Sequence, residues 1–100
     1  MVNETTQSQA EYTAMALRVA PQAKVIGSQT AGADGNLSEI FFPGDIRTMI
    51  SGIGVNYPDG TETQRIGILP DIEVKPTLIG IRNGKDEILE RALEYIHTGE

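Results

Sequence analysis

A serine three residues before a glutamate stands at the start of a helical pattern in the N-terminal stretch NETTQSQAEYTAMAL. Ser8 and Glu11 fit the S-x-x-E capping box, in which each side chain bonds the backbone N–H of the other residue. Such a cap stabilises a helix by about 1 kcal/mol and requires no chemistry. On these four residues alone, the cap is the favoured interpretation of Ser8.

The same position also suits a nucleophile. A serine at the junction of a strand and a helix presents its hydroxyl at the positive end of the helix dipole. The backbone N–H of the next residue, Gln9, is then free to donate to the oxyanion that forms when Ser8 attacks a carbonyl. A neutral hydroxyl is a weak nucleophile, so this interpretation also requires a base within reach of Ser8.

Three segments stand in an order that resembles the S41 peptidases, the tail-specific or C-terminal processing proteases: NETTQSQAEYTAMAL, VIGSQTAGADG and GILPDIEV. In that family a strand leads to a nucleophilic serine three residues before a glutamate. A V-G-E-x-T-x-G-K-G loop and a G-I-x-P-D-I-x-V segment follow. The resemblance extends from Val2 to about Ile96, and its last motif is the most specific. It implies that Ser8 is the nucleophile and that the Gln9 N–H is an oxyanion donor.

One position departs from the serine–lysine members of this family. Their base is the lysine of the G-K-G step, which aligns here with Ala33, and alanine cannot accept a proton. The nearest lysines, Lys24 and Lys85, lie outside the motif. The chain is therefore closer to the branch that resembles the tricorn core protease, in which a histidine from an upstream segment is the base.

In that branch a glutamate just before the G-V-x-P-D segment completes the catalytic group, and its place falls on Gln64. Glutamine can orient a base by hydrogen bonding but supplies no negative charge. Glu62 is the nearby carboxylate if the register shifts by two. His97, the only histidine, lies in the last turn of a predicted helix, where a partial positive charge suits the dipole. Since nothing in the sequence places His97 near Ser8, we expect the base to come from outside this chain.

Metal and cofactor chemistry has little support. Asp34-Gly35-Asn36 resembles the opening of a calcium loop, but Glu39 stands where position six requires glycine. The glycines near Thr30 could form a phosphate-binding nest, but the lysine and hydroxyl residue of a P-loop are absent. The chain has no cysteine, which excludes disulfides, thiolate metal sites and a cysteine nucleophile. We therefore expect neither a cofactor nor a metal.

Length and charge limit the remaining functions. One hundred residues form at most one domain, and a net charge of -6 argues against nucleic-acid binding, which needs a basic face. No apolar run approaches the roughly 20 residues that span a bilayer. The first residues lack the basic and apolar regions of a signal peptide. We expect residues 1–100 to be the C-terminal part of one S41-type catalytic domain.

The elements that must position these residues alternate between helix and strand. Apolar residues at helical spacing predict a helix that begins at Ser8 and is stopped by Pro21. A short strand at Lys24–Gly27 follows, so that residues 1–3 would be the end of a preceding strand. Further short strands are predicted at residues 39–42, 47–51, 54–57, 63–68 and 72–74, with a turn at Tyr57–Gly60.

A second helix is predicted over residues 83–97. Glu87 and Arg91 are spaced for an i,i+4 ion pair on its surface. Its apolar residues form one stripe, which we expect to be buried: Ile88, Leu89, Ala92, Leu93 and Ile96.

Together these features predict an α/β fold, which the resemblance specifies as crotonase/ClpP-like, with this chain as its C-terminal half. The implied function is serine-type hydrolysis of a peptide or protein substrate. An upstream segment would supply the base, so we expect this chain alone to be inactive. The resemblance also implies a cell-envelope or secreted parent protein. The alternative is a non-catalytic ligand- or peptide-binding module of the same fold, as in related retinoid-binding domains.

Overall fold

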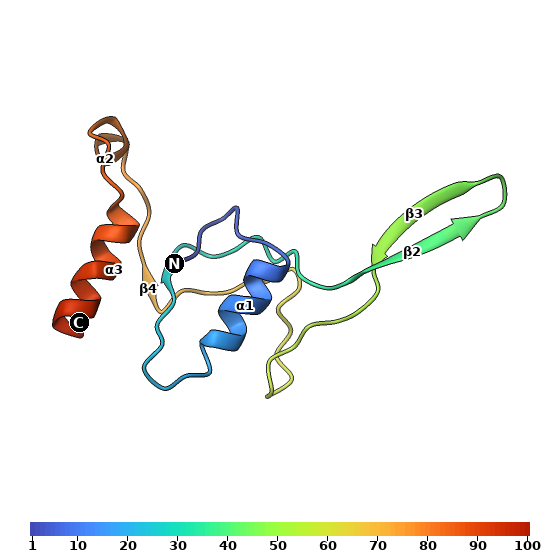
Figure 1. Ribbon diagram of the computed structural model, residues 1–100, viewed down its shortest axis with the longest axis horizontal. Coiled ribbons are helices and arrows are strands. Elements are labelled where there is room, and N and C mark those ends of the chain that lie inside the picture. The colour runs from blue at the N-terminus through green and yellow to red at the C-terminus, as the bar shows by residue number, and fades with distance from the viewer.

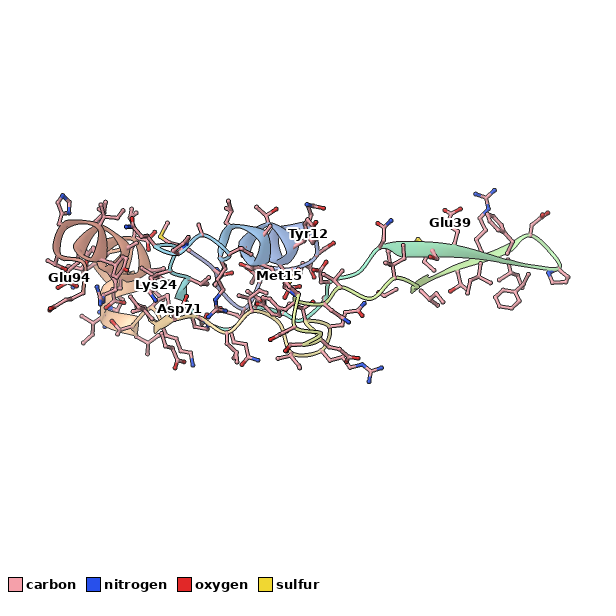
Figure 2. The ribbon with its side chains drawn as sticks, turned by 90° about the horizontal axis from the view of Figure 1, so that it is seen from below. Tyr12, Met15, Lys24, Glu39, Asp71 and Glu94 are labelled. Atoms are coloured by element: carbon pink, nitrogen blue, oxygen red, sulfur yellow. The ribbon has the colours of Figure 1, made fainter.

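The computed structural model describes residues 1–100 and has the mixed helix and strand content of the predicted α/β class (Figure 1). The elements, in chain order, are α1 (Gln9–Leu17), β1 (Ile26–Gly27), β2 (Leu37–Phe42), β3 (Ile46–Ser51), β4 (Ile72–Glu73), α2 (Leu78–Arg82) and α3 (Glu87–Thr98). The molecule is long and thin, with extents of 58 × 36 × 15 Å (Figure 2).

A small parallel sheet organises the centre of the molecule. β1 pairs in parallel with β4, in the register Ile26↔Ile72, and Val2 forms a parallel bridge to Gly27 on the other side of β1. α1 connects Val2 to β1, so the predicted strand–helix–strand unit is confirmed. Gly27 has a φ of 134°, and a Cβ added there would lie 1.8 Å from the carbonyl oxygen of Val2. Only glycine therefore allows the two backbones to approach this closely.

The hydrophobic core is small: a cluster of four buried side chains, Val2, Met15, Val25 and Ile68, and one further buried apolar residue, Ile26. α1 begins at its predicted position but ends at Leu17, before Pro21, and hydrogen-bonded turns follow it. Two polar side chains, Glu11 and Thr63, are as fully buried as the largest core residue. The centre of the fold is thus held by polar as well as apolar burial.

β2 and β3 form an antiparallel hairpin that projects from this centre (Figure 1). Its tight turn includes Gly44 and Asp45, both at positive φ. Neither strand contains a buried residue, and both of its faces lie open along its length (Figure 2). Because opposite residues share a face, one face of the hairpin is uncharged and is made of Ser38, Ile40, Phe42, Ile46, Thr48 and Ile50.

Two predicted strands are wrong. Residues 54–57 contribute only one bridge, Asn56↔Glu62, which flanks the correctly predicted turn at Tyr57–Gly60. Residues 63–68 form a turn, in which Ile66 and Gly67 donate to the carbonyl oxygen of Thr63. The sequence pattern of these segments reflects only their near neighbours along the chain. Their backbone groups form hydrogen bonds with other loops and not with a neighbouring strand.

The C-terminal helix was predicted too early in the chain, and α2 was not predicted. Asp86 caps α3 by accepting a hydrogen bond from the Leu89 N–H (2.9 Å). The predicted buried stripe is wrong for this chain, since α3 contains no buried residue and Ile96 is 74% exposed. The spacing identified the apolar face, which contacts β1 but is covered only in part within this chain.

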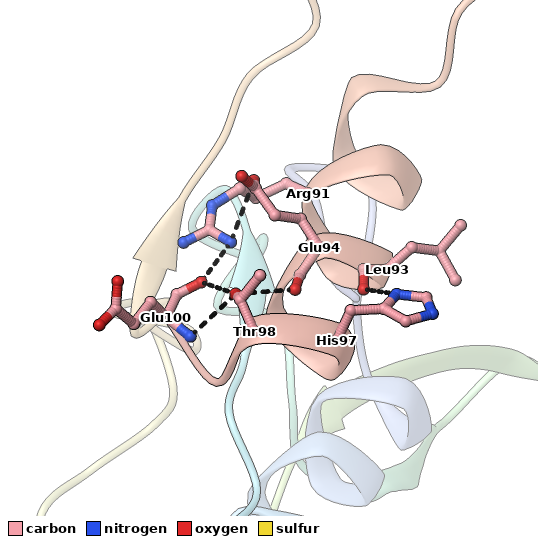
Figure 3. A network of polar contacts seen from close by, with 6 residues as sticks. All are labelled: Arg91, Leu93, Glu94, His97, Thr98 and Glu100. Atoms are coloured by element: carbon pink, nitrogen blue, oxygen red, sulfur yellow. Dashed lines mark hydrogen bonds and ion pairs between the residues drawn. The ribbon is translucent and has the colours of Figure 1, made fainter.

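The predicted pair between Glu87 and Arg91 is also absent. Glu87 accepts hydrogen bonds from the N–H and hydroxyl of Thr77, which join α3 to the start of α2. Arg91 instead pairs with Glu94 (3.4 Å) and donates to the carbonyl oxygen of Glu100 (Figure 3). None of the helices is long and apolar enough to cross a membrane.

Candidate active site

Ser8 occupies a strained turn between Val2, on the sheet, and α1. Its φ and ψ are 55° and -126°, a combination that residues with a side chain rarely adopt. The preceding turn is held by Asn3, whose carbonyl oxygen accepts from the Thr6 N–H (2.9 Å). Ser8 is exposed at this turn. A sharp strand-to-helix turn of this kind exposes a serine hydroxyl at the end of a sheet.

Ser8 and Glu11 take up the predicted capping-box arrangement, but only the Glu11 side chain closes a hydrogen bond in it. The Ser8 N–H donates to Glu11 Oε2 (3.1 Å), as the box requires. The Glu11 N–H, however, donates to the carbonyl oxygen of Ser8 (2.8 Å), and the Ser8 side chain makes no cap hydrogen bond. The hydroxyl is therefore free, and the cap interpretation accounts for Glu11 better than for Ser8.

Gln9 is the first residue of α1, and its backbone N–H has no partner within the chain. The next N–H groups are already used: Ala10 donates to the Gln7 carbonyl oxygen, and Tyr12 to that of Ser8. The free N–H groups at the start of a helix lie at its positive end and favour a negative charge. Ser8 and Gln9 thus place a hydroxyl and an unpaired N–H on adjacent residues.

The loop after β1 lies beside this turn. The Ala31 N–H donates to the Thr6 carbonyl oxygen (3.0 Å), and the Ser8 N–H donates to that of Ala33 (3.1 Å). Ala33, the position aligned with the lysine base of the serine–lysine members, is therefore next to Ser8. It offers only a methyl group there, and a methyl group cannot accept a proton from Ser8.

Gln64 lies against the same loop, farther along it. Its Nε2 donates to the carbonyl oxygens of Asp34 (2.8 Å) and Ile53 (3.3 Å), while its Oε1 makes no hydrogen bond within the chain. No hydrogen bond joins Gln64 to Ser8 or Gln9, but Gln64 and Ser8 bond the carbonyl oxygens of consecutive residues, Asp34 and Ala33. Glu62, the alternative carboxylate, is exposed, and its backbone pairs with Asn56.

Neither the histidine nor any lysine of this chain bonds to the Ser8 hydroxyl. His97 lies in the last turn of α3, as predicted, with its Nδ1 2.7 Å from the carbonyl oxygen of Leu93 (Figure 3). Lys75 pairs with Glu73 beside β4. These positions leave the Ser8 hydroxyl without an activating group from its own chain.

A second polar cluster closes the opposite end of α1. Arg18, at the C-terminus of the helix, pairs with Asp71 (2.7 Å) and donates to the Leu69 carbonyl oxygen. Asp71 also accepts from the Val25 N–H (2.7 Å). Burial opposes ionisation of Asp71, but the Val25 N–H and the Arg18 guanidinium outweigh it and lower the pKa of the carboxyl group. This cluster attaches the GILPDIEV segment to β1 and α1.

The sequence patterns predicted neither the role of Thr30 nor the hydrogen bonds of Glu11 to residues far from it in the sequence. Thr30 is buried, and its hydroxyl lies between the Glu11 carboxylate and the backbone N–H of Ile68. A threonine within the loop motif was the available signal, but no local pattern pairs it with residues 11 and 68.

Known proteins resemble this chain both in sequence and in structure. The model of peptidase family S41 matches residues 1–74. A putative peptidase from Parabacteroides merdae has a similar structure, with a TM-score of 0.80 and 28% sequence identity over 89% of this chain and 28% of that chain. Mature CPAF, alone and complexed with lactacystin, gives TM-scores of 0.79 and 0.81 at 28% identity, over 94% of this chain and 19% of that chain. No curated protein matches the sequence. The chain thus spans less than a third of the length of these structures.

Proposed function

The chain belongs to peptidase family S41, and from this premise we propose that it supplies the nucleophile of a serine-type peptidase within a longer protein. Ser8 Oγ attacks the scissile carbonyl carbon while a base accepts the hydroxyl proton. The base then protonates the leaving amine as the acyl-enzyme forms. Water, deprotonated by the same base, releases the acid product and restores Ser8.

The observation that carries this proposal is the pairing of a free hydroxyl with a free N–H on adjacent residues. Ser8 is exposed, is held at an unfavourable φ and makes no side-chain hydrogen bond. The Gln9 N–H is unpaired beside it and would stabilise the oxyanion together with a second amide from the upstream segment. A serine that served only as a helix cap would use its hydroxyl for the cap.

The proposed base is a histidine of the upstream segment, because Ala33 leaves an inert methyl group at the position of the family's lysine. Gln64 is proposed to orient this base. Two carbonyl oxygens hold its Nε2, which fixes the side chain and leaves Oε1 available to accept an imidazole N–H. The 100-residue chain alone is then expected to be inactive.

The proposal includes the wider setting of the site. The fold is of the crotonase/ClpP-like kind, with residues 1–100 as the C-terminal part of one catalytic domain. The substrate is a peptide or protein, and the parent protein acts in the cell envelope or outside the cell. The long S41 relatives that share this substructure support a larger domain around it.

Labelling with a serine-reactive phosphonate tests the proposal. The longer protein is expected to be labelled at Ser8, and Ser8→Ala is expected to abolish both the labelling and peptide hydrolysis while the protein stays folded. Hydrolysis that persists in Ser8→Ala would remove Ser8 from the mechanism. Hydrolysis by the isolated 100-residue chain would contradict the need for an external base.

The alternative, a non-catalytic ligand- or peptide-binding module, is favoured by one specific observation: no base of this chain is bonded to the Ser8 hydroxyl. Such a module retains the exposed turn but does not react. A longer protein that binds peptides without labelling at Ser8 would establish this alternative.

A further inference from the structure

Glu11 is a fully buried carboxylate that no cation neutralises. Its exposed fraction is 0%, and none of the ion pairs of the chain includes it. It is the third residue of α1, where the helix dipole favours a negative charge. A buried charge is tolerated only when hydrogen bonds satisfy it, so the donors around Glu11 explain its presence.

Four donors converge on the two carboxylate oxygens. Oε1 accepts from the hydroxyl of Thr30 and from the Gly32 N–H (2.8 Å). Oε2 accepts from the N–H groups of Ala33 (3.0 Å) and Ser8 (3.1 Å). The carboxylate therefore joins the turn that carries the serine directly to the loop that lies beside it.

The network also includes a residue of GILPDIEV, the third segment that resembles the peptidase family. The Ile68 N–H donates to the hydroxyl oxygen of Thr30 (2.7 Å), so the hydroxyl proton of Thr30 is directed to Glu11. Ile68 is itself fully buried. We call these six residues, Ser8, Glu11, Thr30, Gly32, Ala33 and Ile68, the elbow network. Two of the three segments that resemble the peptidase family meet at its one carboxylate, and the third joins them through Thr30.

One member of the elbow network has an unfavourable backbone conformation, and a second has a conformation and a space that only glycine fits. Ser8 has a φ of 55°, and Gly32 has a φ of 69° in a space so close that an added Cβ would lie 2.8 Å from the Arg65 carbonyl carbon. Unfavourable conformations persist only where the surroundings over-determine them. Glu11 bonds the N–H of both residues and so holds both conformations at once.

We propose that Glu11 is a positioning residue for the reaction, and the inference rests on the proposed function of Ser8. Its carboxylate fixes the direction of the Ser8 hydroxyl and of the Gln9 N–H relative to the loop at Thr30–Ala33. It touches no reacting atom. Rather, it keeps the nucleophile and the oxyanion donor in one geometry. Catalysis by proximity requires such groups to be positioned to within a fraction of an ångström.

Glu11→Gln tests this role because it keeps the shape of the side chain and changes only the acceptors. Whichever oxygen the amide nitrogen replaces, two of the four donors then face another donor. Asp71→Asn is the matched control: Asp71 also accepts a backbone N–H and holds the GILPDIEV segment, but it does so at the far end of α1.

In the longer protein, Glu11→Gln is expected to lower kcat and the rate of phosphonate labelling by about 10- to 100-fold, with KM within about twofold. Asp71→Asn is expected to leave both rates within about twofold at a temperature at which both variants are folded. Amide hydrogen exchange is expected to accelerate at Gly32 and Ala33 in Glu11→Gln only.

Equal labelling of Glu11→Gln and the wild type, or an equal loss in Asp71→Asn, would overturn the inference. An unlabelled wild type would instead refute the proposed function of Ser8. In that case amide hydrogen exchange alone tests whether Glu11 positions the loop. Equal exchange rates at Gly32 and Ala33 in the two variants would reject this role.

Discussion

The elbow network and the β2–β3 hairpin hold their backbones in opposite ways. The hairpin is a regular ladder with no buried residue, so its shape depends on backbone pairing and a tight turn alone. The elbow network has almost no regular pairing, yet it buries Glu11 and Thr30 and holds Ser8 at an unfavourable φ. Buried polar groups hold a single geometry only when all of them are hydrogen-bonded. A reactive serine needs such a fixed geometry.

The largest expected effect concerns the glycine beneath the elbow network. Gly27→Ala is expected to destabilise the protein by about 3 kcal/mol or more, because its Cβ would lie 1.8 Å from the Val2 carbonyl oxygen at a φ of 134°. Gly44→Ala in the hairpin turn is the control: its φ is 88°, but its surroundings are open. It should cost about 1–2 kcal/mol. Chemical unfolding measures the free energy of unfolding of both variants. Equal losses would show that the close contact of Gly27 with Val2 does not affect stability.

A smaller effect is expected for Thr30→Val, which keeps the side-chain shape and removes the hydroxyl. The Ile68 N–H loses its acceptor and Glu11 loses a donor, at an expected cost of about 2 kcal/mol. Thr48→Val makes the same change on an exposed hairpin strand, where the expected change is within about 0.5 kcal/mol. Thermal unfolding compares the two, and a hairpin variant as unstable as Thr30→Val would remove the distinction between the regions.

The Asp71 cluster predicts a pH dependence that the uncharged face of the hairpin cannot share. The pKa of Asp71 is lowered in the folded state, so its stabilisation is present above its unfolded pKa of about 3.9 and is lost as the pH falls through the folded pKa. At neutral pH Asp71→Asn is expected to lose about 1 kcal/mol relative to the wild type. This difference in stability between the wild type and Asp71→Asn should narrow below about pH 4. A difference in unfolding temperature that stays constant between pH 3 and pH 6 would contradict a lowered pKa of Asp71.

The smallest effect on stability is expected for Ser8→Ala. A working helix cap would lose about 1 kcal/mol, but the Ser8 hydroxyl makes no cap hydrogen bond. We therefore expect a change within about 0.5 kcal/mol, measured by thermal unfolding. A loss of 1 kcal/mol or more would restore the cap interpretation.

Sequence patterns predicted the parts of the molecule that depend on neighbours along the chain. The S-x-x-E pattern located the start of α1, and the β-branched run after it located β1. The apolar alternation at residues 63–68 predicted a strand wrongly, because the Arg65 N–H bonds Gly32 and the Thr63 carbonyl oxygen closes a turn. The stripe of α3 identified an apolar face but not whether this chain covers it.

The site was predictable to the same extent. Ser8 and Gln9 follow from a local motif, whereas the reach of Glu11 to residues 30–33 depends on a loop 19 residues away in sequence. Such a contact has no local signature, since a glutamate three residues after a serine fits a simple cap equally well. Only the fold shows that the carboxylate serves two segments at once.

The central claim is that Ser8 carries a free, reactive hydroxyl, and covalent labelling of the longer protein tests it most directly. A serine-reactive phosphonate is expected to add one label, which peptide mapping by mass spectrometry locates at Ser8, and Ser8→Ala should not be labelled. A folded, peptide-binding protein in which Ser8 stays unlabelled, or in which the label lies on another residue, would contradict the account.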